Sequence, residues 1–250
     1  MAASKDSLFG EQAGTVELLW GPRPQPTRGP KPTLSVERIA RAAIEVADAE
    51  GLAAVSMQRV AGTLNFTKMS LYRHVPGKAE LIALMTDTAI GEPPEPAAVE
   101  GGWRARLQEW AYRLLAMFQR HPWLLAATVG PRIMGPNEMG WMERAIAALD
   151  GTGLDGGERM DAVVVISGHI RTIAQQAGGT PDPEAQMVAP IVALMRVHGE
   201  RYPAVTAALA SAVAHDSRDK GLDFGLQRIL DGLGLFIGER SGTHEGAGHG

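Results

Sequence analysis

Cysteine is absent from the 250-residue sequence, and aromatic residues make up only 5% of it. Without cysteine there are no disulfide bonds and no thiolate sites, which is compatible with a reducing compartment, and we expect a cytoplasmic protein. No apolar run approaches the ~18 residues that a membrane-spanning helix needs. No basic segment followed by an apolar one opens the chain, so we expect no membrane partner.

Common enzyme signatures are also missing, since the sequence has no GxxxxGK[ST], GxSxG or HExxH pattern. Gly151–Gly156 match the spacing of a dinucleotide-binding loop. That loop works only after a strand, and the residues before it are typical of a helix. The seven histidines do not cluster at metal-ligand spacing. We therefore expect a protein that is not an enzyme and has no catalytic residues, no cofactor and no metal site.

The residues that are present favour helices. Hydrophobic residues make up 45% of the chain, which is ample for a core. Ala-, Leu- and Arg-rich segments dominate and β-branched runs are scarce, so we predict an all-α protein. The predicted parts are a disordered or extended arm (1–33), a first helical domain (34–90), a helical bundle (103–240) and a disordered tail (241–250).

The N-terminal arm contains Gly and Pro at high density, which is typical of extended chain. Within it, Val16–Trp20 form an apolar island that could dock on the folded part. Arg28 and Lys31 fit either a basic arm lying along DNA or a solubilising tail, and the sequence leaves both interpretations open.

Charge is unevenly distributed along the chain. The formal net charge is −4. Residues 22–78, however, hold nine Lys and Arg against four acids, a net of +5, so the remainder carries −9. A basic N-terminal module on an acidic body is the distribution expected of a protein that touches DNA at one end.

Two short helices joined by a tight turn are predicted within this basic module. Ser56 and Thr67 are N-cap residues, one ahead of each helix. Asn65 lies in the turn, and asparagine is among the few residues that tolerate the left-handed backbone conformation. Leu71 and Val75 form the inner face of the second helix.

The outer face of the second short helix is dense in polar side chains. So short a helix is not stable alone. An exposed polar face on so short a helix is explained if the helix lies in the major groove of DNA. The predicted phosphate contacts are Ser56, Tyr72, His74 and Lys78, and the predicted base contacts are Gln58, Lys68, Met69, Ser70 and Arg73, with Thr67 capping the helix within the same DNA-binding surface.

The segment SMQRVAGTLNFTKMSLYRHVPGKAEL resembles the signature of the tetracycline-repressor (TetR) family of one-component regulators. Leu71-Tyr72-Arg73, then His74 and Lys78, stand where the family pattern places them. Asn65 replaces the usual Gly, a chemically mild departure that bears on turn stability. The resemblance is firm over residues 34–90 and extends more weakly to the C-terminus.

This resemblance implies a sequence-specific transcriptional regulator, and most simply a repressor. Residues 34–90 would form an N-terminal three-helix helix-turn-helix DNA-binding domain, and residues 103–240 a C-terminal helical bundle for ligand binding and dimerisation. It would bind a palindromic operator on double-stranded DNA as a homodimer, and a small apolar effector would release it. By the same resemblance, the helices at 157–178 and 222–240 would pair with their mates across the dimer. Both carry more apolar surface than one face needs.

Large, soft side chains concentrate at the start of the bundle. At helical spacing such residues usually form a core, and the alternative is an apolar effector pocket with a few polar anchors. His169 is more often a hydrogen-bonded core residue than a ligand. The candidate effector-binding residues are Trp110, Phe118, Met134, Trp141, His169 and Gln175.

Two other classes of function stay open at this point. One is a helical enzyme or carrier with an accessory helix-turn-helix, which the missing catalytic motifs disfavour. The other is a transcriptional activator of the same fold. The identity of the effector is not encoded in any motif that we recognise.

Overall fold

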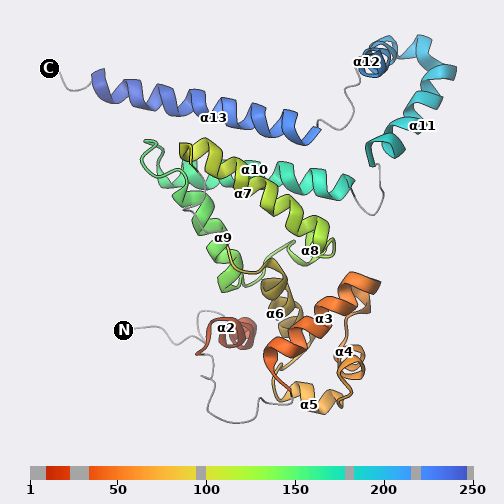
Figure 1. The fold of residues 1–250 in the computed structure, drawn as a ribbon, viewed down its shortest axis with the longest axis vertical. Coiled ribbons are helices and arrows are strands. Elements are labelled where there is room, and N and C mark those ends of the chain that lie inside the picture. Colours follow the sequence, from red (N-terminus) through yellow and green to blue (C-terminus); the bar gives the residue numbers. More distant parts are fainter. Residues whose placement is uncertain (1–9, 23–33, 94–99, 178–182, 215–220, 247–250) are drawn as a thin grey trace. The chain divides into compact units, whose positions relative to one another are not determined.

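The structure is a computed structural model that describes residues 10–22, 34–93, 100–177, 183–214 and 221–246. These residues form helices and no strand (Figure 1). Arg28 and Lys31 lie outside the described residues. Contacts divide the chain into two compact units, a first unit of Met1–Pro96 with His121–Arg144 and a second unit of Ala97–Arg120 with Ala145–Gly250.

The all-α prediction is confirmed, with a helix-turn-helix region in the N-terminal half and a helical C-terminal region. The domain boundaries at 90 and 103 stay predictions, although residues 121–144 pack with the N-terminal helices. The first unit contains η1 (Gly10–Gln12), α2 (Ala13–Trp20), α3 (Val36–Glu50), η2 (Leu52–Ala54), α4 (Met57–Leu64), α5 (Lys68–Tyr72), α6 (Lys78–Ile90), α8 (Leu124–Ala127) and most of α9 (Pro136–Ala147). The second contains α7 (Gly102–Arg120), α10 (Gly156–Gln176), α11 (Pro183–His198), η4 (Gly199–Arg201), α12 (Pro203–Ala214) and α13 (Gly221–Gly246).

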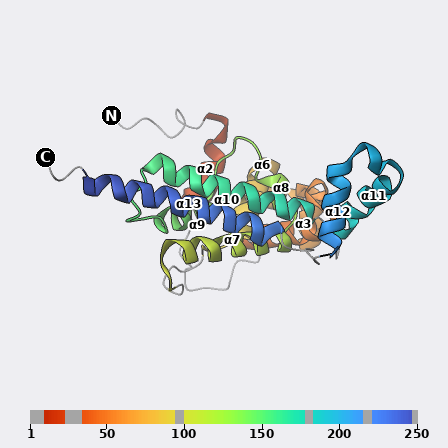
Figure 2. The same cartoon turned by 90° about the horizontal axis from the view of Figure 1, so that it is seen from above.

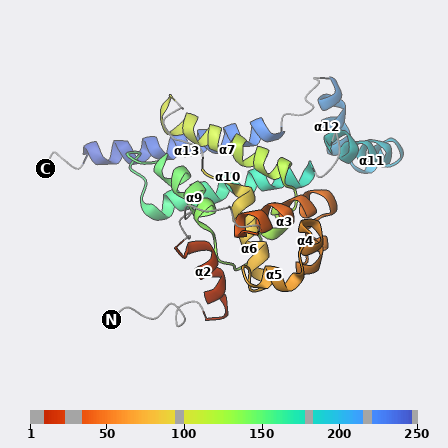
Figure 3. The same cartoon turned by 60° about the horizontal axis from the view of Figure 1, so that its bottom comes forward.

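Helices α3, α4 and α5 pack as a three-helix group against α6 (Figure 3). Three hydroxyl side chains cap the starts of these helices, and two of them, Ser56 and Thr67, are the caps predicted from sequence. Ser35 Oγ accepts from the Arg38 amide at 3.3 Å, and Ser56 Oγ accepts from the Arg59 amide at 3.1 Å. Thr67 caps α5 in the same way. The core of the group is apolar and fully buried, and includes Ile39, Val55, Val60, Leu71 and Val75.

The turn between α4 and α5 depends on Asn65. Its backbone is left-handed, with φ 60° and ψ 38°, as predicted. It is the one non-glycine residue with positive φ in the described part of the chain. In this conformation the amides of Asn65 and Phe66 close the end of α4, bonding Gly62 O at 3.1 Å and Ala61 O at 2.9 Å.

The prediction of a disordered or extended arm over 1–33 is wrong for Ala13–Trp20, which form helix α2. A helix of eight residues is not stable in isolation, so tertiary contacts must stabilise α2. Thr15, Val16 and Leu19 are buried, and α2 packs on α6. The indole Nε1 of Trp20 also donates to Met134 O at 2.9 Å. The apolar island therefore docks on the first unit.

A buried carboxylate on α6 caps helix α9. Asp87 is 4% exposed, and its Oδ1 accepts from the amides of Asn137 at 2.9 Å and Glu138 at 3.1 Å. The Asn137 side chain donates back to Asp87 O at 2.9 Å. Gly135, which lies at the N-cap position of α9, has no side chain to offer, and a Cβ there would lie 2.2 Å from the Asp87 carboxyl carbon. Asp87 thus supplies from α6 the cap that α9 lacks.

A second polar contact fastens α3 to the segment before α8. Asp48 Oδ1 meets His121 Nδ1 at 2.8 Å and accepts from Trp123 Nε1 at 2.7 Å. Both rings are buried and lie with their centroids 6.0 Å apart. These contacts explain why residues 121–144 pack with the N-terminal helices.

In the second unit, α10 packs against α7 and α13 (Figure 2). Ile166 and Ile170 on α10, with Leu226 and Leu230 on α13, are fully buried. His169 Nε2 contacts Leu222 O at 3.0 Å.

Polar contacts also connect α7 to α13. Arg104 Nη2 donates to Gln227 at 2.8 Å and to Asp231 at 2.5 Å. Tyr112 donates its hydroxyl to Asp223, and this hydrogen bond raises the pKa of Tyr112. The prediction of a disordered tail from 241 is wrong for the backbone of 241–246, which continues α13.

Replacing Asn65 tests the cost of the turn between α4 and α5. Asn65→Ala should lower the free energy of unfolding by about 1 kcal/mol, because a Cβ-bearing residue without a polar side chain resists the left-handed conformation. Asn65→Gly should keep or slightly raise stability. Urea unfolding followed by circular dichroism gives both values. Equal midpoints for the Ala and Gly variants would contradict this account.

Replacing Asp87 tests the cap on α9. Asp87→Ala should lower the free energy of unfolding by about 1–3 kcal/mol, since two part-buried amides lose their acceptor. Asp87→Asn is the matched control, because it keeps one acceptor oxygen of the same size and should cost less. Thermal and urea unfolding measure both variants. An alanine variant as stable as the parent protein would rule out the capping role.

Candidate nucleic-acid interface and effector residues

Helix α5 presents an exposed face between two buried anchors. It is only five residues long, ends earlier than predicted, and continues through Arg73 and His74 as a turn. Leu71 and Val75 are fully buried, which fixes the orientation of the segment. Lys68, Met69, Tyr72 and Arg73 are exposed, and Met69 is 65% exposed. The predicted inner and outer faces are both present.

Three cations border this surface. Lys78 is the first residue of α6, next to the N-cap Gly77, where backbone amides and the helix dipole favour an anion. Lys68 and Arg73 lie on and just after α5. Within the described part of the chain, none of the three has an acidic partner within ion-pair distance. Their charges are therefore available to phosphates or to base edges.

Two other basic residues of the same module are engaged locally. Arg59 forms an ion pair with Glu50 at 2.5 Å. The hydrogen bond to Arg59 lowers the pKa of Glu50, and the same bond raises the pKa of Arg59. Both side chains are open to solvent, so the pair contributes little stability. The guanidinium of Arg38 lies over the Phe66 ring, 5.8 Å from its centroid. These contacts hold the two guanidinium groups within the module, and its net charge stays +5 because Glu50 is already counted in it.

The remaining predicted DNA contacts are placed differently. Ser56 and Thr67 use their hydroxyls as helix caps, and Ser70 Oγ lies 3.0 Å from Thr67 Oγ1. Gln58 is exposed near the start of α4. His74 is half-buried and lines a cleft beside α2.

Four candidate effector residues lie in the second unit. Trp110 and Phe118 are buried on α7. The guanidinium of Arg171, on α10, lies over the Phe118 ring at 5.3 Å from its centroid. His169 contacts the backbone at Leu222, and Gln175 is exposed. The structure thus brings Arg171 to the aromatic face of α7, whereas Gln175 faces solvent.

The other two candidates belong to the first unit. Met134 lies in the loop before α9, where its carbonyl accepts from Trp20. Trp141 is buried on α9, and its Nε1 donates to Gly91 O at 3.2 Å, just after the last residue of α6. These contacts support α9 against the N-terminal helices.

Sequence reasoning missed the polar contacts that fasten α9 and the α8 segment. A signal was available for Asp87, which is an acid within the apolar stretch of α6 that includes Leu84 and Met85. A second signal was the sequence Gly135-Pro136-Asn137, a helix start without its own capping side chain. Neither signal identifies the residue with which it pairs, because Asp87 and the start of α9 are about fifty residues apart in the sequence.

Among the described residues, no three His, Asp or Glu side chains gather in a group able to hold a metal ion. Among the described helices, none combines the length and apolar character needed to cross a membrane.

Comparison with known proteins places these features in a family. Residues 35–85 match the family of bacterial regulatory proteins, tetR family, and residues 95–236 match the tetracyclin repressor-like C-terminal domain. The HTH-type transcriptional repressor DrrR1 of Streptomyces coeruleorubidus is 39% identical over 253 residues, which cover 96% of this chain and 92% of DrrR1.

Solved structures show the same fold. Apo ActR from Streptomyces coelicolor matches with a TM-score of 0.69 at 28% identity, over 84% of this chain and 99% of ActR. ActR in complex with actinorhodin matches with a TM-score of 0.66 at 29% identity, over 80% and 95% of the two chains. With its exposed α5 face, its capped turn and matches over both regions, the chain belongs to the TetR family of transcriptional regulators.

Proposed function

We propose that this protein is a transcriptional repressor that binds a near-palindromic operator as a homodimer and leaves it when a small apolar effector binds. The observation that carries the proposal is the outer face of α5, with Lys68, Met69 and Arg73 exposed over the buried anchors Leu71 and Val75. A relative with 39% identity, DrrR1, is a repressor. Because its target is the chromosome, the protein acts in the cytoplasm.

The proposed contacts with DNA divide into positioning and reading. Lys78, at the start of α6, contacts a phosphate together with Tyr72. Lys68 and Arg73 reach base edges, where both residue types favour guanine, and Met69 contacts a thymine methyl group. Ser56, Gln58, Thr67, Ser70 and His74 complete the proposed DNA-binding surface.

The proposed dimer interface lies on α10 and α13. Each helix buries one face within the second unit and leaves large apolar side chains on another. Val164 is 67% exposed on α10, and Phe224 and Leu235 are 69% and 73% exposed on α13. Such side chains on packed helices favour a second copy of the same surface, which would place one α5 in each half-site.

The proposed effector site uses those candidate residues from the sequence that are buried or half-buried in the second unit. ActR has been solved with (S)-DNPA and with actinorhodin, which supports a small-molecule effector here. Trp110 and Phe118 would form the apolar wall and His169 a polar anchor.

Release follows from differential affinity. An effector shifts the protein off DNA only if it binds better to a conformation whose two α5 helices no longer match the groove spacing. The contacts that Asp87 and Trp141 make between α6 and α9 supply a route, because α6 begins at Lys78 beside the DNA surface.

A binding assay on DNA tests the proposal. The duplex is a palindrome from beside the protein's own coding region, and the control has the same composition in scrambled order. We expect the palindrome to bind at least a hundredfold more tightly and candidate aromatic ligands to weaken that binding. Equal affinity for both duplexes would overturn the proposal.

Replacing the cations one at a time separates positioning from reading. Lys78→Ala should weaken binding to every sequence and lower the slope of log affinity against log salt by about one unit. Arg73→Ala or Lys68→Ala should cost about 1–3 kcal/mol on the operator and relax the preference at particular base pairs. Fluorescence anisotropy over a salt series measures all three, with Glu45→Gln as a control on α3. If all three variants lost the same affinity on operator and random DNA, the division would be wrong.

Charged substitutions on the exposed apolar faces test the dimer. Val164→Glu with Leu235→Glu should produce a folded monomer with much weaker operator binding, because like charges meet and apolar burial is lost. Ala207→Glu with Ala208→Glu, exposed on α12, is the matched control and should stay dimeric. Sedimentation at micromolar concentration reports the mass of each. An unchanged dimer in the first variant would exclude this surface.

A further inference from the structure

The segment between α7 and α8 is fixed to α3 through a single oxygen atom. Asp48 Oδ1 lies 2.8 Å from His121 Nδ1 and accepts a hydrogen bond from Trp123 Nε1 at 2.7 Å. An ionised carboxylate can only accept, so His121 Nδ1 carries a hydrogen as well. Both rings are buried, and moving them away from Asp48 would leave two buried N–H groups without this acceptor, which is costly. The contact therefore favours one arrangement of the segment over intermediate ones.

This segment continues α7 without a break. Helix α7 ends at Arg120, and His121 is the next residue. Phe118 is buried in the last turn of α7, and the guanidinium of Arg171 on α10 lies over its ring. Because His121 directly follows the helix, a shift or rotation of the last turn of α7 acts on His121 through the chain itself.

The other side of the contact belongs to the DNA-binding group. Asp48 lies in the last turn of α3, and α3 packs against α4 and α6. Val46 and Ala47, the two residues before Asp48, are buried in this packing. Helix α4 leads through the turn at Asn65 into α5, so the position of α3 bears on the face that meets DNA.

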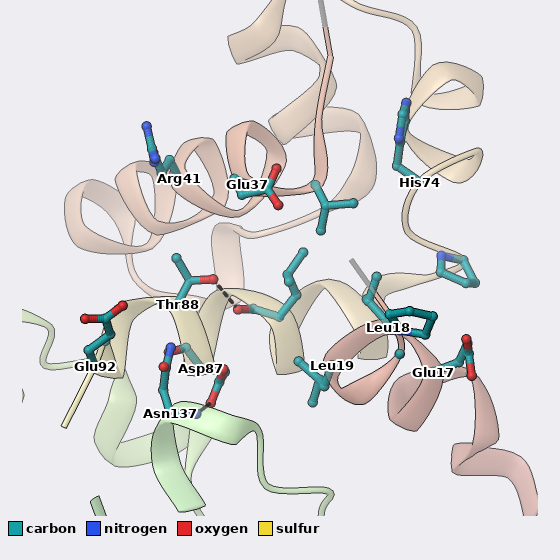
Figure 4. Close-up of a pocket in the computed structure, with 17 residues that line it drawn as sticks. Glu17, Leu18, Leu19, Glu37, Arg41, His74, Asp87, Thr88, Glu92 and Asn137 are labelled. Carbon is teal, nitrogen blue, oxygen red and sulfur yellow. Dashed lines mark hydrogen bonds between the residues drawn. The ribbon is translucent and has the colours of Figure 1, made fainter. Parts of the chain in front are cut away.

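The contact is separate from the one that Asp87 makes. Figure 4 shows Asn137 of α9 beside Asp87 of α6, where the two residues exchange hydrogen bonds. Asp87 thus fastens the later part of residues 121–144 to α6, whereas Asp48 fastens their beginning to α3. The two contacts share no residue, so each can be removed while the other stays.

We infer that Asp48 is a positioning residue of the repressor, which passes the state of the last turn of α7 to α3 and from there to α4 and α5. The inference rests on the proposed function, because Phe118 in that turn is a wall of the proposed effector site. Asp48 acts through His121 and Trp123, and it contacts neither the effector nor DNA. A residue that served stability alone would change the melting temperature, but it would not change how α5 responds to an alteration at Phe118.

Amide hydrogen exchange on the full-length protein, without DNA and without ligand, tests the inference. Phe118→Leu alters the effector wall, and the measured quantity is the exchange rate of the amides in residues 56–75. We expect this substitution to change that rate at least about threefold in the parent protein and less than about 1.5-fold in the Asp48→Ala protein. Asp48→Asn keeps an acceptor oxygen of the same size and should restore the response. Equal responses in the parent and in Asp48→Ala, or no response in the parent, would overturn the inference.

Two matched controls separate this coupling from a general loosening. Leu107→Val truncates another buried apolar residue of α7, and its effect on residues 56–75 should be the same with and without Asp48. Glu45→Ala removes an exposed carboxylate from α3 and should leave the response to Phe118→Leu intact. Circular dichroism checks that each variant is folded, and Phe118→Tyr replaces Phe118→Leu under the same criteria if the latter unfolds. A dependence of the Leu107→Val effect on Asp48 would contradict the inference.

Operator binding by the same variants distinguishes this inference from the proposed function. Fluorescence anisotropy on the palindrome should show that Phe118→Leu changes the affinity at least about threefold in the parent and less than about 1.5-fold in Asp48→Ala. If no palindrome binds, the proposed function fails, and the exchange measurement still decides the role of Asp48. If the palindrome binds and the effects of the two substitutions on its affinity are additive, the inference about Asp48 fails alone.

Discussion

A buried carboxylate on α6 holds helix α9 in the first unit. Asp87 accepts hydrogen bonds from two amides at the start of α9, and the Asn137 side chain donates a hydrogen bond to the backbone carbonyl of Asp87. Because Asp87 is 4% exposed, removing these part-buried bonds is costly. Gly135 is confined by the same contact, since any side chain there would occupy the place of the carboxylate. The helix that begins at Lys78 is thereby fixed to α9.

This connection also links the α5 segment, through α6, to helix α9. Leu71 and Val75 hold the α5 segment from beneath, and α6 follows it immediately in sequence and carries Asp87. Hydrogen bonds therefore join α9 directly to the helix that follows α5. The proposed switch between bound and released states requires elements that adopt discrete arrangements, and packed helices do so in other proteins. Asp48, with its bonds to His121 and Trp123, makes a comparable connection from α3.

Helix α2 adds buried residues to the first unit. It precedes residues 35–85, which match the DNA-binding part of the family, and its Val16 and Leu19 are buried like core residues. Helix α2 lines the cleft together with residues of α3 and α6.

The sequence by itself determined the three-helix DNA-binding group. Its signals are local: Ser35, Ser56 and Thr67 bond to amides three residues on, Asn65 adopts a conformation that few residues tolerate, and the spacing of Leu71 and Val75 sets the buried face. Only the tertiary structure decided that Ala13–Trp20 are helical, that Asp87 caps α9 and that a cleft lies beside α2. Those features join segments that are far apart in the chain. Composition and periodicity are local properties, and they do not predict which distant surfaces contact each other. An eight-residue helix gains its stability from the surface on which it packs, so the sequence of α2 alone does not predict that this segment is helical.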